Sequence, residues 1–260
     1  MSAITTIESC DSTNKYLHAR LAAEPMLPSG TTVRAVTQTA GRGQRGNSWE
    51  AEPGKNLTFS MVLRPGPLGP ARHFLLSEAV AIAVARFLQS LPEMCAGHDV
   101  RIKWPNDILV DGKKIAGILI ENALGPKGEL IYSIVGIGLN VNQKAFSDAA
   151  PMATSIARLT GREYDLYLMM ESLADMINGN VERLSKALSA ADEMKGFEEI
   201  QEEYYRLLWR ERFACHKWLD ARTDEIFAAR LAGVLPSGHL CLQLPEGGER
   251  RYLFKEVFPV

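Results

Sequence analysis

Three glycines and two arginines stand within six residues of this chain, in the segment Thr39-Ala-Gly-Arg-Gly-Gln-Arg-Gly-Asn-Ser-Trp49. Glycine allows a backbone to approach a ligand closely, and arginine binds phosphate or carboxylate through a rigid fork of donors. The segment therefore predicts an anion-binding loop, with a solvated surface loop as the alternative. It does not run into a helix, which argues against a Rossmann turn, and it lacks the Gly-Lys-Ser/Thr of a P-loop.

Three further motifs combine charged or amide side chains with strand-like neighbours. Lys103-Trp-Pro-Asn-Asp107 ends a strand in a turn and presents a cation and a carboxylate, although an Asp at a turn more often binds backbone N–H groups. Lys114 opens the apolar run Lys114-Ile-Ala-Gly-Ile-Leu-Ile-Glu121, where a solvated lysine is the alternative. In Gly136-Ile-Gly-Leu-Asn140 the glycines allow close backbone approach, and Asn140 either binds a ligand or ends the strand.

Hydrophobic periodicity and turn signals predict a mixed sheet with interspersed helices. Residues 11–14 resemble the capped start of a helix. The other predicted elements are strands at 32–37, 56–63, 100–104, 114–121 and 130–141, and helices at 72–88, 155–159, 166–188 and 197–208. Early strands are expected to pair as hairpins. The elements do not alternate as in a doubly wound fold, so the α+β class is favoured.

The pattern of predicted elements changes near residue 213, from long helices to short strands. Short strand-like runs follow at 217–219, 225–231, 240–244 and 251–254, separated by turn signals such as Pro236-Ser-Gly238. Several short strands at close spacing indicate a small β-barrel. We therefore predict a larger domain over residues 1–212 and a barrel over residues 213–260.

The composition is that of an ordinary globular protein, with 46% hydrophobic and 23% charged residues and a net charge of -2. This charge gives no bulk electrostatic case for nucleic acid or an anionic membrane as a partner. The N-terminus does not resemble a signal peptide, and no apolar run approaches the roughly 20 residues of a membrane span. The four cysteines lack zinc or disulfide spacing, so we expect a cytoplasmic protein whose thiols are reduced and mostly packed as small hydrophobes.

Taken together and in order, the motifs resemble those of the biotin protein ligases, which attach biotin to a lysine of a carrier domain. Asp11-Ser-Thr-Asn14 looks like the family's biotin-contact motif, and Thr37-Gln-Thr-Ala-Gly-Arg-Gly43 like its biotin and nucleotide loop. The motifs at 103–107, 114–121 and 136–140 match the rest, and the tail resembles the family's SH3-like domain. The resemblance implies a class II synthetase-like mixed sheet packed with helices, in the form that lacks an N-terminal DNA-binding domain.

The resemblance also implies roles for individual residues. Biotin would be bound by Ser12, Thr13, Asn14, Gln38, Gly41, Arg42, Gly43, Lys114 and Gly117, with apolar residues near 115–119 along its tail. The nucleotide would be bound by Arg42, Arg45, Trp49, Asn56, Lys103 and Asn140. Arg42 and Lys114 would grip the biotin carboxylate and the α-phosphate, and Asp107 would orient or deprotonate the acceptor lysine. The loop from Ala40 to Pro53 would close over the ligands as a lid.

The implied substrates are ATP and biotin, with Mg²⁺ bound mainly through phosphates, so its protein ligands are not identified. The implied partner is the biotin carboxyl carrier domain of a carboxylase, without nucleic acid or membrane, and the protein would be a monomer or a homodimer. A lipoate or octanoate transferase and a non-catalytic binding module are the alternatives. One position departs from the pattern, because many family members carry arginine where this chain has Gln44. That arginine is linked in the family to holding the reactive intermediate.

Overall fold

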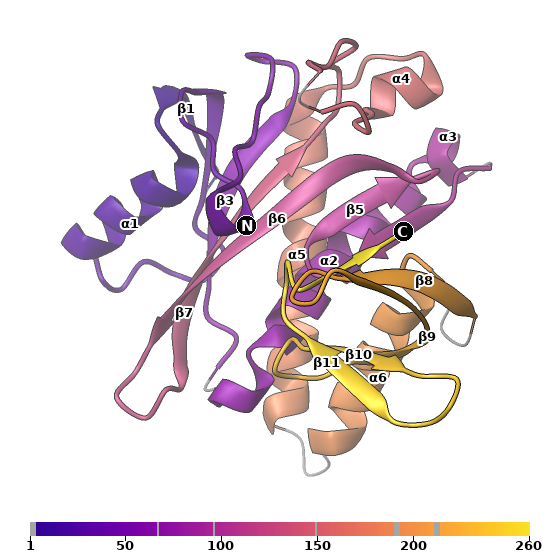
Figure 1. The fold of residues 1–260 in the computed structure, drawn as a ribbon. Coiled ribbons are helices and arrows are strands. Elements are labelled where there is room, and N and C mark those ends of the chain that lie inside the picture. The colour runs from indigo at the N-terminus through magenta and orange to yellow at the C-terminus, as the bar shows by residue number, and fades with distance from the viewer. Residues whose placement is uncertain (1–3, 67, 96, 149, 190–192, 211–213) are drawn as a thin grey trace.

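The structure is a computed structural model that describes residues 4–66, 68–95, 97–148, 150–189, 193–210 and 214–260, without the side chains of Arg45 and Glu193. Seven strands form the larger sheet in the order β1-β2-β3-β7-β6-β5-β4 (Figure 1). The sheet is mixed, because β1 and β2 are parallel and the other neighbours are antiparallel. The strands are β1 (Ile4–Cys10), β2 (Thr32–Gln38), β3 (Leu57–Leu63), β4 (Val100–Lys103), β5 (Asp107–Val110), β6 (Lys113–Leu124) and β7 (Leu130–Leu139).

Three long helices cover one face of this sheet (Figure 1). They are α2 (Phe74–Ser90), α5 (Leu166–Ser189) and α6 (Glu193–Leu207). Helix α2 is apolar on nearly every side because it lies between the sheet and the other two helices, which together bury its surface. This layer forms the main hydrophobic core.

The opposite face of the sheet is covered only in part. Helix α1 (Thr13–Ala23) packs its buried Leu17 and Leu21 over β2, β3 and β7, where they meet Val33, Val62 and Ile134 in a second, smaller core. The described chain adds short elements around the sheet, namely η1 (Gln44–Gly46), η2 (Pro70–Arg72), α3 (Pro92–Cys95) and α4 (Ile156–Thr160). The part of this face beside α1, over β6 and β7, is covered not by α1 but by the loop that follows β2.

A five-stranded antiparallel sheet follows, in the order β11-β10-β9-β8-β12. Its strands are β8 (Cys215–Asp220), β9 (Glu225–Val234), β10 (Leu240–Gln243), β11 (Glu249–Tyr252) and β12 (Val257–Pro259). Two hydrogen bonds fix the turn between β9 and β10 against the larger body: the Trp104 indole N–H donates to the Gly238 carbonyl at 3.1 Å, and the Phe74 N–H to the Pro236 carbonyl at 3.0 Å. We refer to this sheet as the C-terminal barrel.

The predicted α+β class is confirmed, and each strand and helix expected from the sequence has a counterpart within a few residues. Three strands were not expected, namely β1, β5 and β12. The expectation that early strands pair as hairpins holds for β2 and β3, which are antiparallel, whereas the unexpected β1 runs parallel to β2 and α1 connects them. The predicted boundary between residues 212 and 213 lies outside the described residues.

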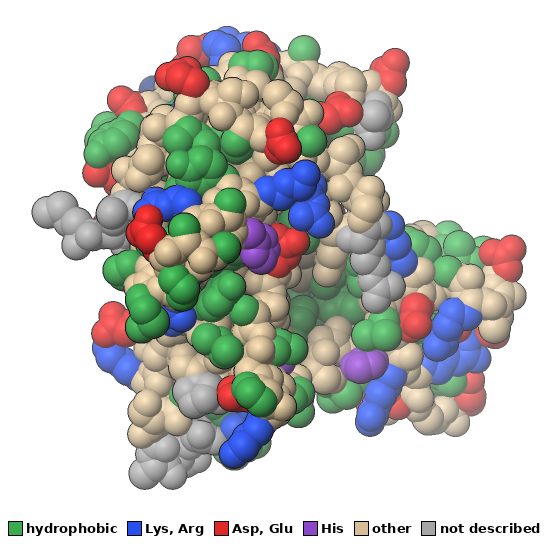
Figure 2. All heavy atoms as spheres, turned by 90° about the vertical axis from the view of Figure 1, so that its left-hand side faces the viewer, with side chains coloured by type: hydrophobic (Ala, Val, Ile, Leu, Met, Phe, Trp, Pro, Cys, Tyr) green, Lys and Arg blue, Asp and Glu red, His purple; other side chains and the backbone are tan. Residues whose placement is uncertain are grey.

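The expectation that the cysteines are mostly packed is also wrong. All four are free thiols, but Cys95 and Cys215 are exposed and only Cys241 is buried. Acidic and basic side chains are interspersed on the face shown in Figure 2, without a large area of one sign. No helix within the described ranges is long and apolar enough to cross a membrane.

Candidate functional site

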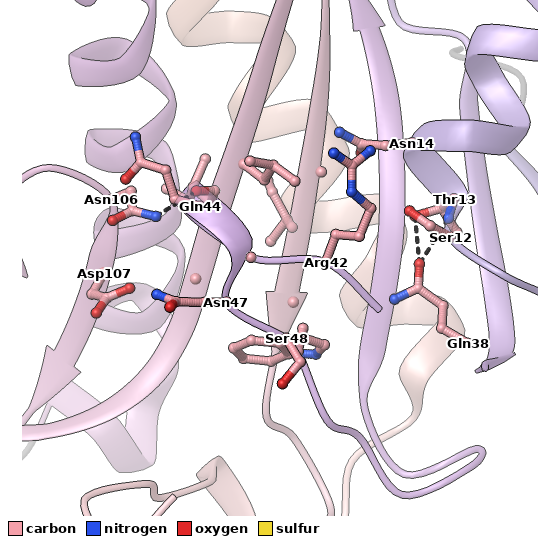
Figure 3. A pocket seen from close by; sticks show the side chains of 18 of the residues that line it. Ser12, Thr13, Asn14, Gln38, Arg42, Gln44, Asn47, Ser48, Asn106 and Asp107 are labelled. Atoms are coloured by element: carbon pink, nitrogen blue, oxygen red, sulfur yellow. Dashed lines mark hydrogen bonds between the residues drawn. The ribbon is translucent and has the colours of Figure 1, made fainter. Parts of the chain in front are cut away.

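A cavity lies on the open face of the larger sheet, between the start of α1, the glycine–arginine loop and strands β6 and β7. Figure 3 shows polar residues of α1 and β2 on one side of this cavity, and Asn106 and Asp107 on the other, with the loop carrying Gln44 and Asn47 between them. Ten of the predicted site residues line it: Ser12, Thr13, Asn14, Gln38, Arg42, Gly43, Trp49, Asp107, Lys114 and Gly117.

One end of the cavity is a buried group of neutral polar side chains. Ser12, Thr13 and Asn14 are all at least nine-tenths buried, because they form the N-terminus of α1 where the helix meets the sheet. The Gln38 side-chain oxygen, at the end of β2, accepts a hydrogen bond from the Thr13 N–H at 2.7 Å and lies 3.0 Å from the Thr13 hydroxyl oxygen (Figure 3). Buried amides and hydroxyls of this kind recognise a ligand that carries both donors and acceptors.

Arg42 extends over the cavity from the glycine–arginine loop. A backbone bridge between Arg42 and Ser48 closes this loop, which contains the short helix η1. The guanidinium group lies 3.3 Å from a carboxylate oxygen of Glu121 on β6 and is about half exposed. A cation in this position can exchange a protein carboxylate for that of a ligand.

Lys114 and Asp107 form a second charged pair, with the ammonium nitrogen 2.7 Å from a carboxylate oxygen. The two residues face each other because β5 and β6 are neighbours, with a register shift between Ile108 and Leu109. The Lys114 ammonium also lies 5.7 Å from the centre of the Trp49 ring, a cation–π distance. The cavity therefore holds a basic and an acidic group in contact, as proton transfer at an amine would need.

The Trp49 ring lies directly on the glycines of β6 and β7. A Cβ atom added at Gly138 would be only 2.1 Å from Cε2 of this ring, and one added at Gly117 would be 3.2 Å from Cζ3. The indole nitrogen is buried and has no hydrogen-bond partner among the described residues. The glycines thus provide a flat apolar floor, which Trp49 covers in this structure.

Of the other predicted residues, four do not line this cavity. Gly41 packs against the Trp49 backbone, where a Cβ would lie 2.3 Å from the carbonyl oxygen. Lys103 lies over the Trp209 ring at 5.4 Å, in a neighbouring cavity against the C-terminal barrel that shares Asp107 with the first. The side chain of Arg45 lies outside the described residues.

The remaining two residues are buried amides. Asn56 donates to Gln143 and accepts from the Val141 N–H, so both ends of its amide are bound within the protein. Asn140 donates to the Thr154 carbonyl at 3.0 Å, while its side-chain oxygen is buried and makes no hydrogen bond within the described ranges. It lines a hollow on the far side of Trp49 and Lys114. Contacts of both residues with a nucleotide stay predictions.

Sequence reasoning missed several residues of the site. Phe254, in the turn between β11 and β12, lines the cavity from the C-terminal barrel. Asn106, which donates to the Ile118 carbonyl at 2.9 Å, was quoted only as part of a motif. Ser60 and Glu121 contact the polar end from β3 and β6. Their strand positions gave no signal, since contacts across a sheet depend on its register.

No group of three acidic, histidine or cysteine side chains in the described part of the chain is arranged to hold a metal ion. A magnesium ion bound mainly by substrate phosphates needs only one or two protein oxygens. The unpartnered Asn140 oxygen beside Lys114 is of the chemical type that such an ion accepts.

Comparisons with known proteins agree with this geometry. Residues 6–140 match the model of the biotin/lipoate A/B protein ligase family. The bifunctional ligase/repressor BirA of Bacillus subtilis is 40% identical over 159 residues, which cover 59% of this chain and 46% of that protein. The biotin–[acetyl-CoA-carboxylase] ligase of Paracoccus denitrificans is 36% identical over 174 residues, covering 63% of this chain and 67% of that protein.

Among solved structures, a biotin protein ligase from Aquifex aeolicus in complex with biotin and ATP superposes with a TM-score of 0.75. It is 25% identical in sequence, and the match covers 100% of this chain and 99% of that one. By contrast, the chain spans about half the length of the ligase/repressors it matches.

Proposed function

Because this chain belongs to the biotin/lipoate A/B protein ligase family, we propose that it is an ATP-dependent biotin protein ligase. In this reaction the biotin carboxylate attacks the α-phosphorus of ATP and expels pyrophosphate, which gives biotinyl-5′-AMP. The amine of an acceptor lysine then attacks the carbonyl of this mixed anhydride and releases AMP. We assign residues 1–212 to the binding of biotin and ATP, and residues 213–260 to the SH3-like domain.

The observation that carries this proposal is the placement of polar and charged groups around the cavity between α1, the glycine–arginine loop and strands β6 and β7. Its buried end offers the hydroxyl and amide groups of Ser12, Thr13 and Gln38. Lys114 lies on the other side, beside Asp107, and Arg42 extends over the cavity, where it pairs with Glu121. Biotin has the matching order, with a ureido ring at one end, an apolar tail and a terminal carboxylate. Lipoate lacks hydrogen-bonding groups at its ring. If lipoate were bound, the polar groups of the protein at the buried end would stay unpaired, at a cost in binding free energy.

The charged groups have distinct tasks in the first half-reaction. A carboxylate and a triphosphate repel each other, so the guanidinium group of Arg42 and the ammonium group of Lys114 must neutralise both near the point of attack. Magnesium bound to the phosphates would add to this neutralisation, with Asn140 as the candidate protein oxygen. We propose that the biotin carboxylate and the ATP phosphates compete with Glu121 and Asp107 for these two cations.

In the second half-reaction the acceptor amine must be neutral when it attacks. Asp107 becomes available once Lys114 turns to the adenylate, and its carboxylate can then accept a proton from the amine. The amine would belong to a biotin carboxyl carrier domain, the partner implied for a biotin ligase. Trp49 and the lid would exclude water, which would otherwise hydrolyse the anhydride.

The test of this proposal is ATP–pyrophosphate exchange with the purified full-length protein and Mg²⁺. Exchange that depends on biotin is expected, followed by transfer of biotin to a purified carrier domain. Exchange with lipoate but not with biotin would assign the chain to the lipoate branch of the family. Omission of Mg²⁺ should abolish the exchange.

A further inference from the structure

A chain of hydrogen bonds runs beneath the cavity from Glu121 to Gln38 and passes through three buried side chains. The Asn14 amide nitrogen donates to Glu121 at 2.7 Å. The Ser60 hydroxyl lies 2.5 Å from the Asn14 side-chain oxygen and 2.6 Å from the Thr13 hydroxyl. The Thr13 hydroxyl in turn lies 3.0 Å from the Gln38 side-chain oxygen.

The number of available protons fixes which group donates and which accepts along this row of hydrogen bonds. A carboxylate can only accept, so Glu121 requires the NH₂ of Asn14 to face it and the Asn14 oxygen to face Ser60. That oxygen can be satisfied only by the single proton of the Ser60 hydroxyl. The oxygens of Thr13 and Ser60 lie 2.6 Å apart, closer than the 3.0 Å between Thr13 and Gln38, so the Thr13 proton fills the shorter contact and is not available to Gln38.

The consequence appears at the end of the chain that faces the cavity. Three close oxygen–oxygen contacts link Gln38, Thr13, Ser60 and Asn14, but only two hydroxyl protons are present to fill them. The contact between Thr13 and Gln38 is left as two acceptors facing one another. A ligand N–H group placed there would supply the missing proton.

Burial keeps water away from the inner part of this hydrogen-bond chain. Ser60 is fully buried, and Thr13 and Asn14 are 3% and 2% exposed. Space for the Asn14 oxygen exists only because residue 136 is glycine, since a Cβ there would lie 2.3 Å from it. Glu121 is itself held by Arg42 at 3.3 Å and by His18 at 3.4 Å.

We propose that Glu121 is a positioning residue that sets the direction of hydrogen bonding through Asn14 and Ser60. Thr13 and Gln38 thereby present acceptors to the N–H groups of a cyclic urea. Glu121 touches neither the urea nor the reacting atoms and acts on the urea through Asn14. This inference rests on the proposed function, because it names the ligand group that the buried end of the cavity selects.

The first test is binding of biotin alone to the full-length protein, measured by calorimetry for the wild type and Glu121→Gln. A glutamine can donate or accept, so the Asn14 amide can exchange the positions of its oxygen and nitrogen. The order of donors and acceptors up to Gln38 is then no longer fixed. We expect biotin to bind about tenfold more weakly. Glu24→Gln removes the same charge from an ion pair with Arg20 at the end of α1, and it should bind biotin as the wild type does.

A double-mutant cycle separates this role from the ion pair with Arg42. In an Arg42→Gln background, Glu121→Gln should still weaken biotin binding, because the path through Asn14 remains. Loss of the effect in that background would show that Glu121 acts only by holding Arg42, and would overturn the proposal. Ser60→Ala interrupts the same chain and should weaken biotin binding while the thermal midpoint shows that the protein is folded.

A biotin analogue methylated on both ureido nitrogens tests the N–H contacts directly. A residue that only stabilises the fold would not change the ratio of the affinities for biotin and this analogue. The steric cost of the methyl groups is the same in every variant, so the ratio of affinities for biotin and this analogue reports the N–H contacts. The ratio should fall in Glu121→Gln and Ser60→Ala. A wild type that does not bind biotin would refute the proposed function, whereas a wild type that binds and a Glu121→Gln variant with the same affinity and ratio would refute only this inference.

Discussion

At the scale of single residues, the cations of the cavity are already paired before any ligand binds. Arg42 contacts Glu121, and Lys114 contacts Asp107 at 2.7 Å. Both pairs are partly exposed, so each contributes little to stability and can be exchanged at small cost. Anionic substrates can therefore compete with the two protein carboxylates for both cations.

Lys114 is the residue on which adenylate formation should depend most. Lys114→Ala removes the ammonium group that neutralises the carboxylate and α-phosphate, and it leaves Asp107 without its partner. We expect biotin-dependent ATP–pyrophosphate exchange to fall by about a hundredfold or more. Lys113→Ala, which removes an exposed lysine beside it, is the matched control. A rate within a few-fold of the wild type would show that Lys114 is not part of the catalytic machinery.

Gln44 should influence how long the intermediate stays bound. It lines the cavity from η1, and its side-chain oxygen is buried without a hydrogen-bond partner in the described part of the chain. Gln44→Arg would add a donor fork for the phosphate of the adenylate. We expect less biotin on bystander proteins such as albumin, by roughly tenfold, with pyrophosphate exchange unchanged. Equal labelling of the bystander by both proteins would contradict this.

At the scale of elements, site residues that lie within one helix or strand were predictable from the sequence. Contacts between residues of different elements were predicted less well. The strand at 114–121 and the helix after residue 12 were predicted, and with them Lys114 and Thr13. The contacts of Ser60, Glu121 and Phe254 were not, because they depend on strand register and on the docking of the C-terminal barrel. Local periodicity carries no information on either. The four-residue strand β5 was also missed, since it is too short to show a clear period.

The lid from Ala40 to Pro53 should change its accessibility when substrates bind. Its backbone bridge between Arg42 and Ser48 is short, and much of the loop is exposed. Trypsin should therefore cut the free protein after Arg42 or Arg45, and biotin with ATP should slow this cleavage by about tenfold or more. Cleavage after Lys127, in the turn between β6 and β7, should keep its rate as an internal control. Equal rates at the lid with and without ligands would exclude closure over the site.

At the scale of the whole molecule, α2 and α6 join the large sheet to the C-terminal barrel. The Tyr205 hydroxyl donates to the Val234 carbonyl at 2.7 Å, and Phe74 packs edge-on against Tyr204 at 6.0 Å. The Phe74 N–H also binds the turn between β9 and β10. Because Phe254 of the barrel lines the cavity, a change in how the barrel packs against α2 and α6 should also change the shape of the cavity.

Glu78, a fully buried residue of α2 near this junction, should make stability depend on pH. Burial raises its pKa to about 8, although the Gln201 side chain offsets part of the shift, and burial likewise raises the pKa of Tyr204. The folded protein therefore holds one more proton than the unfolded chain between the ordinary pKa of 4.5 and about 8. In this window the free energy of unfolding should fall by about 1.4 kcal/mol per pH unit as the pH rises, and level off above it.

Glu78→Gln keeps the size of the side chain and removes its titration, so this part of the slope should disappear. Urea unfolding at pH 5, 6, 7 and 8 measures the slope for each protein. Glu198→Gln, on the exposed face of α6, should retain the wild-type slope. If Glu78→Gln also retained it, another group would be responsible, and Glu78 would be ionised inside the folded protein. We also expect the KM for biotin to rise toward pH 8 in the wild type and to stay constant in Glu78→Gln, which would show that the junction transmits this protonation to the cavity.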